Sequence, residues 1–209
     1  MLILRYLFLI LFIVPFTNHS FAQAPVFEWV KQMGGLGNDY IQRMEIDNNG
    51  DIIILGAFYD DIDLDPGSGN LIYNSVNGSR DIFLAKYDSL CNLIWGNHFP
   101  GGGNQYARDL YIDSNNDIFI CGYFEDTVDF DPGPGNQIFI ETNFNGGFFG
   151  KYSSSTGALV WAKEIDGDPS GLAFVLGITM DQTGSIYLAG DCGGQVDFDP
   201  GPNVYYEYG

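Results

Sequence analysis

The feature that most constrains the fold is an internal repeat with a period of 66. Three tryptophans, Trp29, Trp95 and Trp161, recur with this period. Other residues recur at intervals of 66 and then 68, namely the aspartates Asp47, Asp113 and Asp181 and the glycines Gly56, Gly122 and Gly190. Self-similarity at a fixed period indicates that the chain is built from copies of one supersecondary unit.

Apolar residues within each repeat alternate with a period of two, which is typical of β-strands rather than helices. Ile52, Ile54 and Phe58 fall on one face, and residues 118–124 and 186–192 alternate in the same way. A tight polar turn (DNNGD in the first copy) precedes each of these runs, as in a β-hairpin. Further strand-like runs follow, as in residues 80–88 and 92–99. Each repeat therefore predicts about four short antiparallel strands plus an insertion.

Such units cannot bury both faces alone and must stack on their neighbours. Radial stacking into a β-propeller leaves only short, protected edges. We therefore predict an all-β fold of antiparallel β-propeller blades, built from repeats at about 27–92, 93–158 and a shortened 159–209. A closed propeller normally needs about four to eight blades. The sequence thus predicts an incomplete propeller within residues 23–209, from a longer protein or a truncated gene product.

Residues 81–124, DIFLAKYDSLCNLIWGNHFPGGGNQYARDLYIDSNNDIFICGYF, resemble the SBBP-type β-propeller repeat of secreted bacterial proteins. That family alternates a D-x-F-[VL]-x-K strand, a turn, a Trp-containing strand, a Gly-rich loop and an I-x-D-x-x-G-[ND]-I-Y-[VL]-x-G hairpin. The match recurs from Trp29 to Gly209, with Cys91 in place of a turn glycine and Asn116-Asp117 in place of Gly-Asn. The insertion resembles variants in large secreted proteins of Bacteroidetes-like bacteria. The resemblance implies a propeller and an extracytoplasmic location, but no particular activity.

Residues 1–22 have the pattern of a secretory signal peptide. Arg5 precedes an apolar run at 6–16, and small residues at 20 and 22 favour cleavage before residue 23. A cut after Ala24 is disfavoured because proline follows it. An uncleaved membrane anchor is the alternative, but a spanning helix needs about 20 apolar residues. We predict a secreted or cell-surface protein with no membrane span after cleavage.

The chain has 27 acidic and eight basic residues, a net charge of −19. This charge repels a phosphate backbone, so we expect no nucleic-acid partner. It does make cation binding worth testing. Three cysteines, Cys91, Cys121 and Cys192, show no short C-x-x-C spacing and are interpreted as buried or turn residues, with one disulfide as the alternative.

The candidate site residues lie in the insertion, which reads IDLDPGSG at 62–69, VDFDPGPG at 128–135 and VDFDPGPN at 196–203. One interpretation is a strand-ending turn, because Pro-Gly suits a type II turn and the Asp side chains can accept backbone N–H bonds. The other is a calcium site, because paired carboxylates and turn carbonyls are hard oxygen ligands. An EF-type loop would need glycine at its sixth position and glutamate at its twelfth, and neither is present. The turn is favoured, and the calcium candidates are Asp63, Asp65, Asp129, Asp131, Asp197 and Asp199.

Polar residues that occur once are few. His98 is the only histidine after residue 22, and we interpret it as a surface residue of a strand. Metal catalysis by clustered histidines is excluded by this count, and no G-x-S-x-G nucleophile motif is present. Carboxylate chemistry of the glycosidase type needs only two acids, but no pair stands out.

The sequence therefore favours a non-catalytic binding or scaffold module for a protein or glycan ligand, with no cofactor indicated beyond calcium. One alternative is an extracellular carbohydrate-active enzyme that uses carboxylates. The other is a truncated remnant with no activity.

Overall fold

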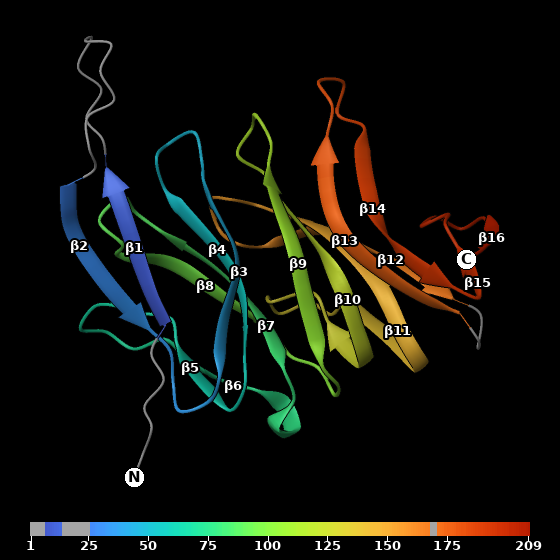
Figure 1. Cartoon of the computed structure of the whole chain (residues 1–209), viewed down its shortest axis with the longest axis horizontal. Helices are drawn as coiled ribbons and strands as arrows, with labels where there is room; N and C mark the ends of the chain where they lie inside the picture. The colour runs from blue at the N-terminus through green and yellow to red at the C-terminus, as the bar shows by residue number, and fades with distance from the viewer. Residues whose placement is uncertain (1–6, 14–25, 168–170) are drawn as a thin grey trace.

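The computed structural model describes residues 7–13, 26–167 and 171–209 (Figure 1). In these residues the chain forms sixteen β-strands and one short 3₁₀ turn, Val76–Gly78. Its largest sheets are antiparallel and follow chain order over four strands each. No helix of the described residues has the length and apolar character needed to cross a membrane. The predicted all-β antiparallel fold is therefore confirmed.

The first complete sheet contains four strands in chain order: β3 (Asp39–Ile46), β4 (Ile52–Phe58), β7 (Asp81–Tyr87) and β8 (Leu93–Phe99). The two middle strands, β4 and β7, are buried along their whole length. A strand is buried in this way when both faces of its sheet are covered. The sheet matches the predicted four-stranded blade.

The second sheet repeats this order with β9 (Gln105–Ile112), β10 (Ile118–Asp129), β11 (Ile138–Tyr152) and β12 (Leu159–Gly167). It is extended beyond β12 by β15 (Gln195–Asp197) and β16 (Tyr206–Tyr208). In both sheets the tryptophan strand is the fourth strand, although it begins the sequence repeat. Each sheet therefore takes its last strand from the following repeat.

The third sheet contains only β13 (Leu172–Met180) and β14 (Ile186–Gly193). These strands correspond to the first two strands of the complete sheets. Within the described residues, β14 pairs with β13 alone, so its other edge carries no third strand. Figure 1 shows the three sheets side by side in chain order.

The hairpin turns that open the three sheets share one backbone requirement. The fourth residue of each turn has a positive φ: 84° at Gly50, 66° at Asn116 and 87° at Gly184. Glycine adopts this left-handed conformation at little cost, and asparagine is the next most tolerant residue. The departure of Asn116 from the glycine of the SBBP-type pattern is therefore compatible with the same turn.

Part of the predicted signal peptide falls on described residues. β1 (Leu7–Ile13) pairs with β2 (Val26–Met33), whereas the predicted cleavage site after residue 22 lies outside the described residues. β2 carries Trp29 and so corresponds to β8 and β12, the fourth strands of the complete sheets. β1 therefore occupies, beside β2, the position that the third strand occupies in the complete sheets.

The core lies between the sheets, because successive residues of a strand point to opposite faces. Ile118 and Ile120 of β10 belong to the cluster shared with the first sheet, whereas Phe119 and Cys121 belong to the cluster shared with the third. All three cysteines are free, so the alternative of a disulfide is wrong. Burial raises the pKa of the Cys121 thiol to about 12, which makes it a poor nucleophile.

The insertion forms a hairpin in each repeat. In the first repeat this hairpin is formed by β5 (Asp61–Asp63) and β6 (Ile72–Asn74). In the second it is formed by the ends of β10 and β11, which pair as far as Asp129 and Ile138. In the third it is formed by β15 and β16. The residues of each insertion therefore form an ordered pair of strands.

Candidate functional site

The insertion hairpins connect neighbouring units of the fold. Each pairs through its backbone with the end of the preceding tryptophan strand or with the residues just after it: Gly34 with Asp63, Gly101 with Val128 and Asp166 with Asp197. In the first case the N–H groups of Gly34 and Asp63 each donate to the other residue's carbonyl, at 3.2 and 3.3 Å. The repeated sequence therefore serves to link adjacent units.

The six calcium candidates lie in the turns of these hairpins and make the same bonds in all three copies. The first aspartate of each pair accepts two backbone N–H bonds at its Oδ1 atom: Asp63 from Asp65 and Leu71, Asp129 from Asp131 and Gln137, and Asp197 from Asp199 and Tyr205. The second aspartate accepts one: Asp65 from Gly67, Asp131 from Gly133, and Asp199 from Gly201. These are the bonds that the turn interpretation predicts.

Hydrogen bonds already occupy part of the capacity of these carboxylates to coordinate a cation. Oδ2 of Asp63 lies 3.1 Å from the amide nitrogen of Asn70 when that amide is oriented to satisfy its neighbours, so both oxygens of Asp63 then accept hydrogen bonds. No group of three or more His, Cys, Asp or Glu side chains in the described residues is arranged to hold a metal ion. Calcium binding at the six aspartates stays a prediction.

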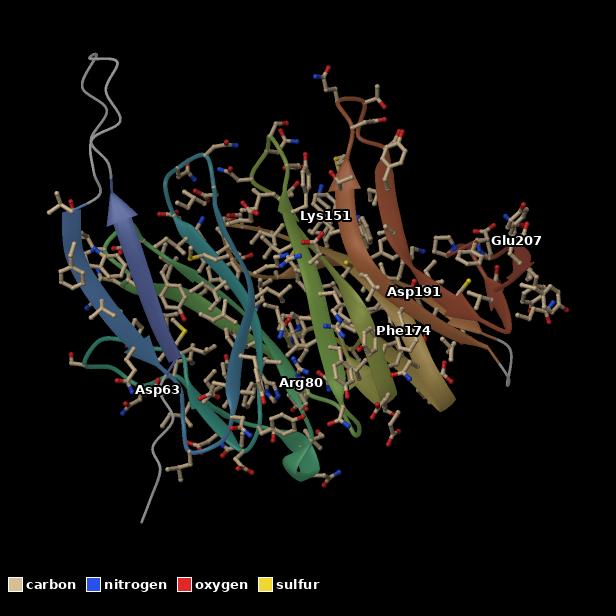
Figure 2. The ribbon with its side chains drawn as sticks, in the orientation of Figure 1. Asp63, Arg80, Lys151, Phe174, Asp191 and Glu207 are labelled. Atoms are coloured by element: carbon tan, nitrogen blue, oxygen red, sulfur yellow. The ribbon has the colours of Figure 1, made fainter. Side chains whose placement is uncertain are left out.

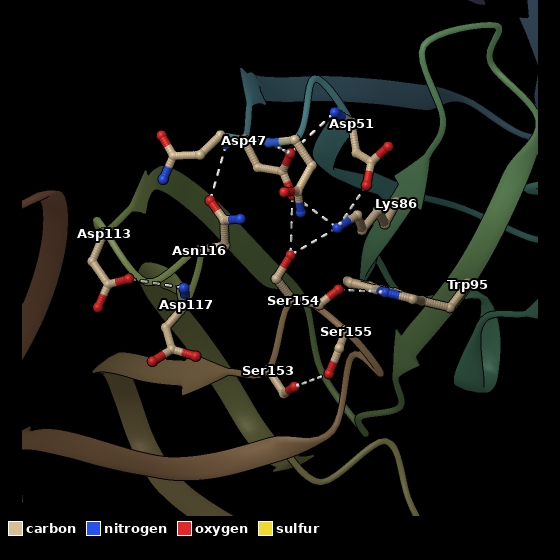
Figure 3. A network of polar contacts seen from close by, with 12 residues as sticks. Asp47, Asp51, Lys86, Trp95, Asp113, Asn116, Asp117, Ser153, Ser154 and Ser155 are labelled. Atoms are coloured by element: carbon tan, nitrogen blue, oxygen red, sulfur yellow. Dashed lines mark hydrogen bonds and ion pairs between the residues drawn. The ribbon is translucent and has the colours of Figure 1, made fainter.

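A buried ion-pair network connects the first and second sheets (Figure 3). Lys86 Nζ lies 2.8 Å from Asp47 Oδ2 and 3.0 Å from Asp51 Oδ2, and donates to Ser154 Oγ at 2.9 Å. Trp95 Nε1 donates to the carbonyl of Ser154 at 3.0 Å. These groups come from one end of β3, β4, β7 and β8 and from the turn after β11. The repeated Asp, Lys and Trp of the sequence are therefore used in the framework.

The electrostatics of this network favour both charged forms. Burial alone would raise the pKa of Asp47, but the Lys86 ammonium and the N–H groups of Asp51 and Asn49 outweigh it and lower that pKa. Burial likewise acts to lower the pKa of Lys86, and its bonds to Asp47 and Asp51 raise it instead. Neither group is therefore poised to transfer a proton near neutral pH.

His98 does not lie where the sequence analysis placed it. Its side chain is only 11% exposed, and Nε2 lies 2.7 Å from Oδ2 of the fully buried Asp81. The rings of Phe58 and Tyr73 lie 5.3 Å from the imidazole. The surface interpretation was wrong, because the insertion hairpin that carries Tyr73 covers this part of β8. Ser79 Oγ donates to Asp81 rather than to His98, so no Ser-His-Asp relay is formed.

An acidic cavity of about 300 Å³ lies between the second sheet and the third insertion. Glu164, Asp166, Asp197 and Asp199 contribute to its lining. Burial, with smaller effects from Asp166 and Glu141, raises the pKa of Glu164 to about 8. Burial and Glu141 also raise the pKa of Asp166. Glu164 occupies the repeat position of His98, and the sequence analysis did not single it out.

A second set of residues that the sequence analysis missed lies at the start of the inner strands, β3, β9 and β13. It is built on one repeated aromatic position, occupied by Tyr40, Tyr106 and Phe174. Figure 2 shows Arg80 and Phe174 toward the end of the inner strands that lies away from the hairpin turns. Tyr106 stacks on Tyr123 of β10 with ring centroids 4.6 Å apart, and Tyr123 meets Phe174 edge to face at 4.6 Å.

Two arginines, Arg80 and Arg108, lie against these rings. The Arg80 guanidinium lies between two of them, 5.0 Å from the Tyr40 centroid and 4.9 Å from that of Tyr106. The Arg108 guanidinium lies 5.0 Å from the Tyr123 centroid, and its Nη2 donates to the Tyr123 hydroxyl at 2.6 Å. We call Tyr40, Arg80, Tyr106, Arg108 and Tyr123 the arginine–tyrosine cluster. A signal was available, because Arg80, Arg108 and Tyr123 break the repeat, with Asn145, Gln42 and Ala57 at equivalent positions.

Comparisons with known proteins support the fold only. No family model matches the chain. It is 24% identical over 191 residues to the uncharacterized WD repeat-containing protein L264 of Acanthamoeba polyphaga mimivirus. The match covers 80% of this chain but only 13% of the viral protein. WD repeats form four-stranded propeller blades, so this distant similarity agrees with the antiparallel sheets, and together they indicate incomplete β-propeller blades.

Proposed function

We propose that the chain is part of an extracytoplasmic β-propeller of the SBBP type that binds a ligand without transforming it. The observation that carries this proposal is that polar residues that recur in the repeat and polar residues that break it make different contacts. Residues that recur in the repeat bond to the framework, as Lys86 and Asp47 do. Side chains that break the repeat gather in the arginine–tyrosine cluster.

The location of this cluster supports a binding role. It draws on β3, β9 and β10 and on the residue before β7, so it spans two neighbouring blades. Binding residues often lie at the ends of elements that a rigid scaffold positions. The amino-terminal leader pattern supports a location outside the cytoplasm.

A carbohydrate-active enzyme is the second candidate, because one observation favours it. Glu164 has a pKa of about 8 and shares a cavity with Asp166. Glycosidases use such a pair, in which one carboxyl is protonated and the other ionised. Four acids crowd the lining of this cavity, and neither tyrosine nor tryptophan is among its lining residues, so it lacks the aromatic platform on which a sugar ring commonly stacks. We therefore rank this role below binding.

The two functions differ in what happens to the ligand. The full chain should be applied to a glycan array and used in pull-down experiments with extracellular proteins, while the release of reducing sugar ends is measured from every glycan that binds. Retention without release supports the binding module. Release that disappears in Glu164→Gln but persists in the control Glu45→Gln, at an exposed position of β3, would establish the enzyme. Failure to retain any ligand would contradict both.

A further inference from the structure

We infer that Arg80 and Arg108 of the arginine–tyrosine cluster bind the carboxylate of an acidic saccharide. This inference rests on the proposed binding function and specifies its ligand. It places the ligand at the start of β3 and β9, where the first two blades meet.

The guanidinium of Arg80 packs against two aromatic rings. Tyr40 and Tyr106 lie about equally far from it, at 5.0 and 4.9 Å, so the group is held between rings of two blades. Its main chain is fixed as well, because Arg80 N donates to Asn104 Oδ1 at 3.2 Å and its carbonyl accepts the N–H of Gln105 at 2.7 Å. Rings that contact the faces of a guanidinium leave its N–H edges for other partners.

Arg108 supplies a second cation on the same aromatic stack. Tyr106 lies 5.9 Å from its guanidinium carbon and 4.9 Å from that of Arg80, so one tyrosine contacts both arginines. The Nη2 atom of Arg108 is used in the bond to Tyr123. Two like charges on one ring repel each other, and an anion bound to both would relieve that repulsion.

Neither arginine has an acidic partner, although the chain has 27 acidic residues. Among the described residues, no carboxylate lies within ion-pair distance of Arg80 or Arg108, and the remaining arginine there, Arg43, pairs with Asp109 at 2.8 Å. Glu125, which contributes to the electrostatics of Tyr106, accepts a bond from Asn104 at 2.9 Å. The Nε atoms of both arginines are buried without a hydrogen-bond partner. A buried N–H without a partner is costly, and because both residues are only half-buried overall, each keeps contact with solvent, from which an anion can approach.

The neighbouring surface favours a sugar over other anions. A carboxylate matches the planar, two-pronged geometry of a guanidinium. Tyr40, 41% exposed, lies beside Arg80 and meets Tyr59 edge to face. An exposed aromatic ring suits the apolar face of a sugar. A uronate carries an apolar ring face and a carboxylate on one small unit, and so fits both features.

Binding of tetragalacturonate and of its methyl ester to the full chain will test this inference. The methyl ester keeps the sugar rings and removes the charge. We expect the acid to bind and the ester to bind at least about tenfold more weakly, because hydrogen bonds between charged groups contribute more than neutral ones. Arg80→Gln and Arg108→Gln should each weaken binding of the acid by about tenfold to a hundredfold.

Arg43→Gln is the matched control, because it removes one exposed positive charge from β3 and leaves the cluster intact. It should change the affinity less than about threefold, since exposed ion pairs contribute little. Arg80→Lys and Arg108→Lys keep the charge but lose the planar fork, and should still weaken binding. These variants also serve if the glutamine variants do not fold, as judged from their melting curves.

The outcomes separate the two proposals. Unchanged binding of the acid by the folded Arg80 and Arg108 variants would overturn the inference. So would equal binding of the acid and its ester, or of the acid and a sulfated sugar that has no carboxylate, because the carboxylate would then not be recognised. Retention of neutral glycans or peptides alone would leave the binding function standing and remove only this ligand. If no ligand of any class binds, both proposals fail.

Discussion

The Nζ atom of Lys86 lies 2.8 Å from Oδ2 of Asp47, and both side chains are almost completely buried. A buried charge is tolerated when it is paired and its remaining hydrogen-bonding groups are satisfied. Asp51 and Ser154 supply the further partners of Lys86, and the amides of Asn49 and Asp51 supply those of Asp47. Ser154 follows β11, so the network also joins the first two blades.

Lys86→Met should destabilise the protein strongly, because it leaves Asp47 buried without its counter-ion. We expect the free energy of unfolding to fall by about 3 kcal/mol, measured by urea denaturation. Lys151→Met is the matched control at the equivalent repeat position. Lys151 pairs with Asp117 at 2.7 Å, but the two side chains are 22% and 30% exposed. Its loss should cost less than about 1 kcal/mol. Equal losses in the two variants would contradict the assigned role of Lys86.

The repeated aspartates of the insertion should act through hydrogen bonds rather than through calcium. We expect added Ca²⁺ and added EDTA to leave the melting temperature essentially unchanged. Asp129→Ala should lower the free energy of unfolding by about 1–3 kcal/mol, because the N–H groups of Asp131 and Gln137 lose their acceptor. Asp131→Ala, which frees one N–H only, should cost less. A melting temperature that rises with Ca²⁺ in the wild type but not in Asp129→Ala would instead establish the calcium site.

The sequence predicted the framework well because the framework is repeated. Alternation in residues such as Ile52 and Ile54 identified the strands, and the spacing of Trp29, Trp95 and Trp161 identified four-stranded units. In the insertions, Asp129 accepts the predicted backbone bonds. Each of these features depends on local chain geometry, which a period-two pattern and turn residues determine.

The candidate site was not predictable in the same way, because the two blades that form it meet only through tertiary packing. Arg80 is far from both Tyr40 and Tyr106 in the sequence, yet its side chain lies between their rings. The burial of His98 beside Asp81 also depends on the insertion hairpin that covers it. The alternation of apolar residues along a strand carries no information about contacts of this kind.

Glu164 should make the stability of the protein depend on pH. Its pKa is raised in the folded protein from the usual 4.5 to about 8, chiefly by burial. The folded state therefore favours the protonated carboxyl, so this stabilisation is complete below about pH 4.5 and is lost as the pH rises toward 8. The melting temperature of Glu164→Gln, relative to wild type, should accordingly increase from pH 5 to pH 8. A difference that is constant over this range would show that Glu164 has an ordinary pKa.

The free edge of β14 should accept a strand with the pattern of β7 and β11. In the complete sheets a glycine of the second strand faces a phenylalanine of the third: Gly56 faces Phe83, and Gly122 faces Phe148. Gly190 of β14 occupies the same position. A cavity of about 500 Å³ lined by Gly190, Val175 and Phe198 lies beside it. Phe198 is 41% exposed, whereas its counterpart Phe130 is fully buried.

A labelled peptide with the sequence of residues 80–88, RDIFLAKYD, should therefore bind the full chain and raise its melting temperature. Binding can be followed by fluorescence anisotropy. The same peptide with Phe83→Glu should bind at least about tenfold more weakly, because a carboxylate would enter an apolar cavity. On the chain, Leu188→Glu should also weaken binding, since it places a carboxylate in the lining of the same cavity. Gly184→Asn, in the exposed turn of the same hairpin, is the control and should bind normally. Equal binding of the native and Phe83→Glu peptides would show that β14 does not select a strand of this pattern.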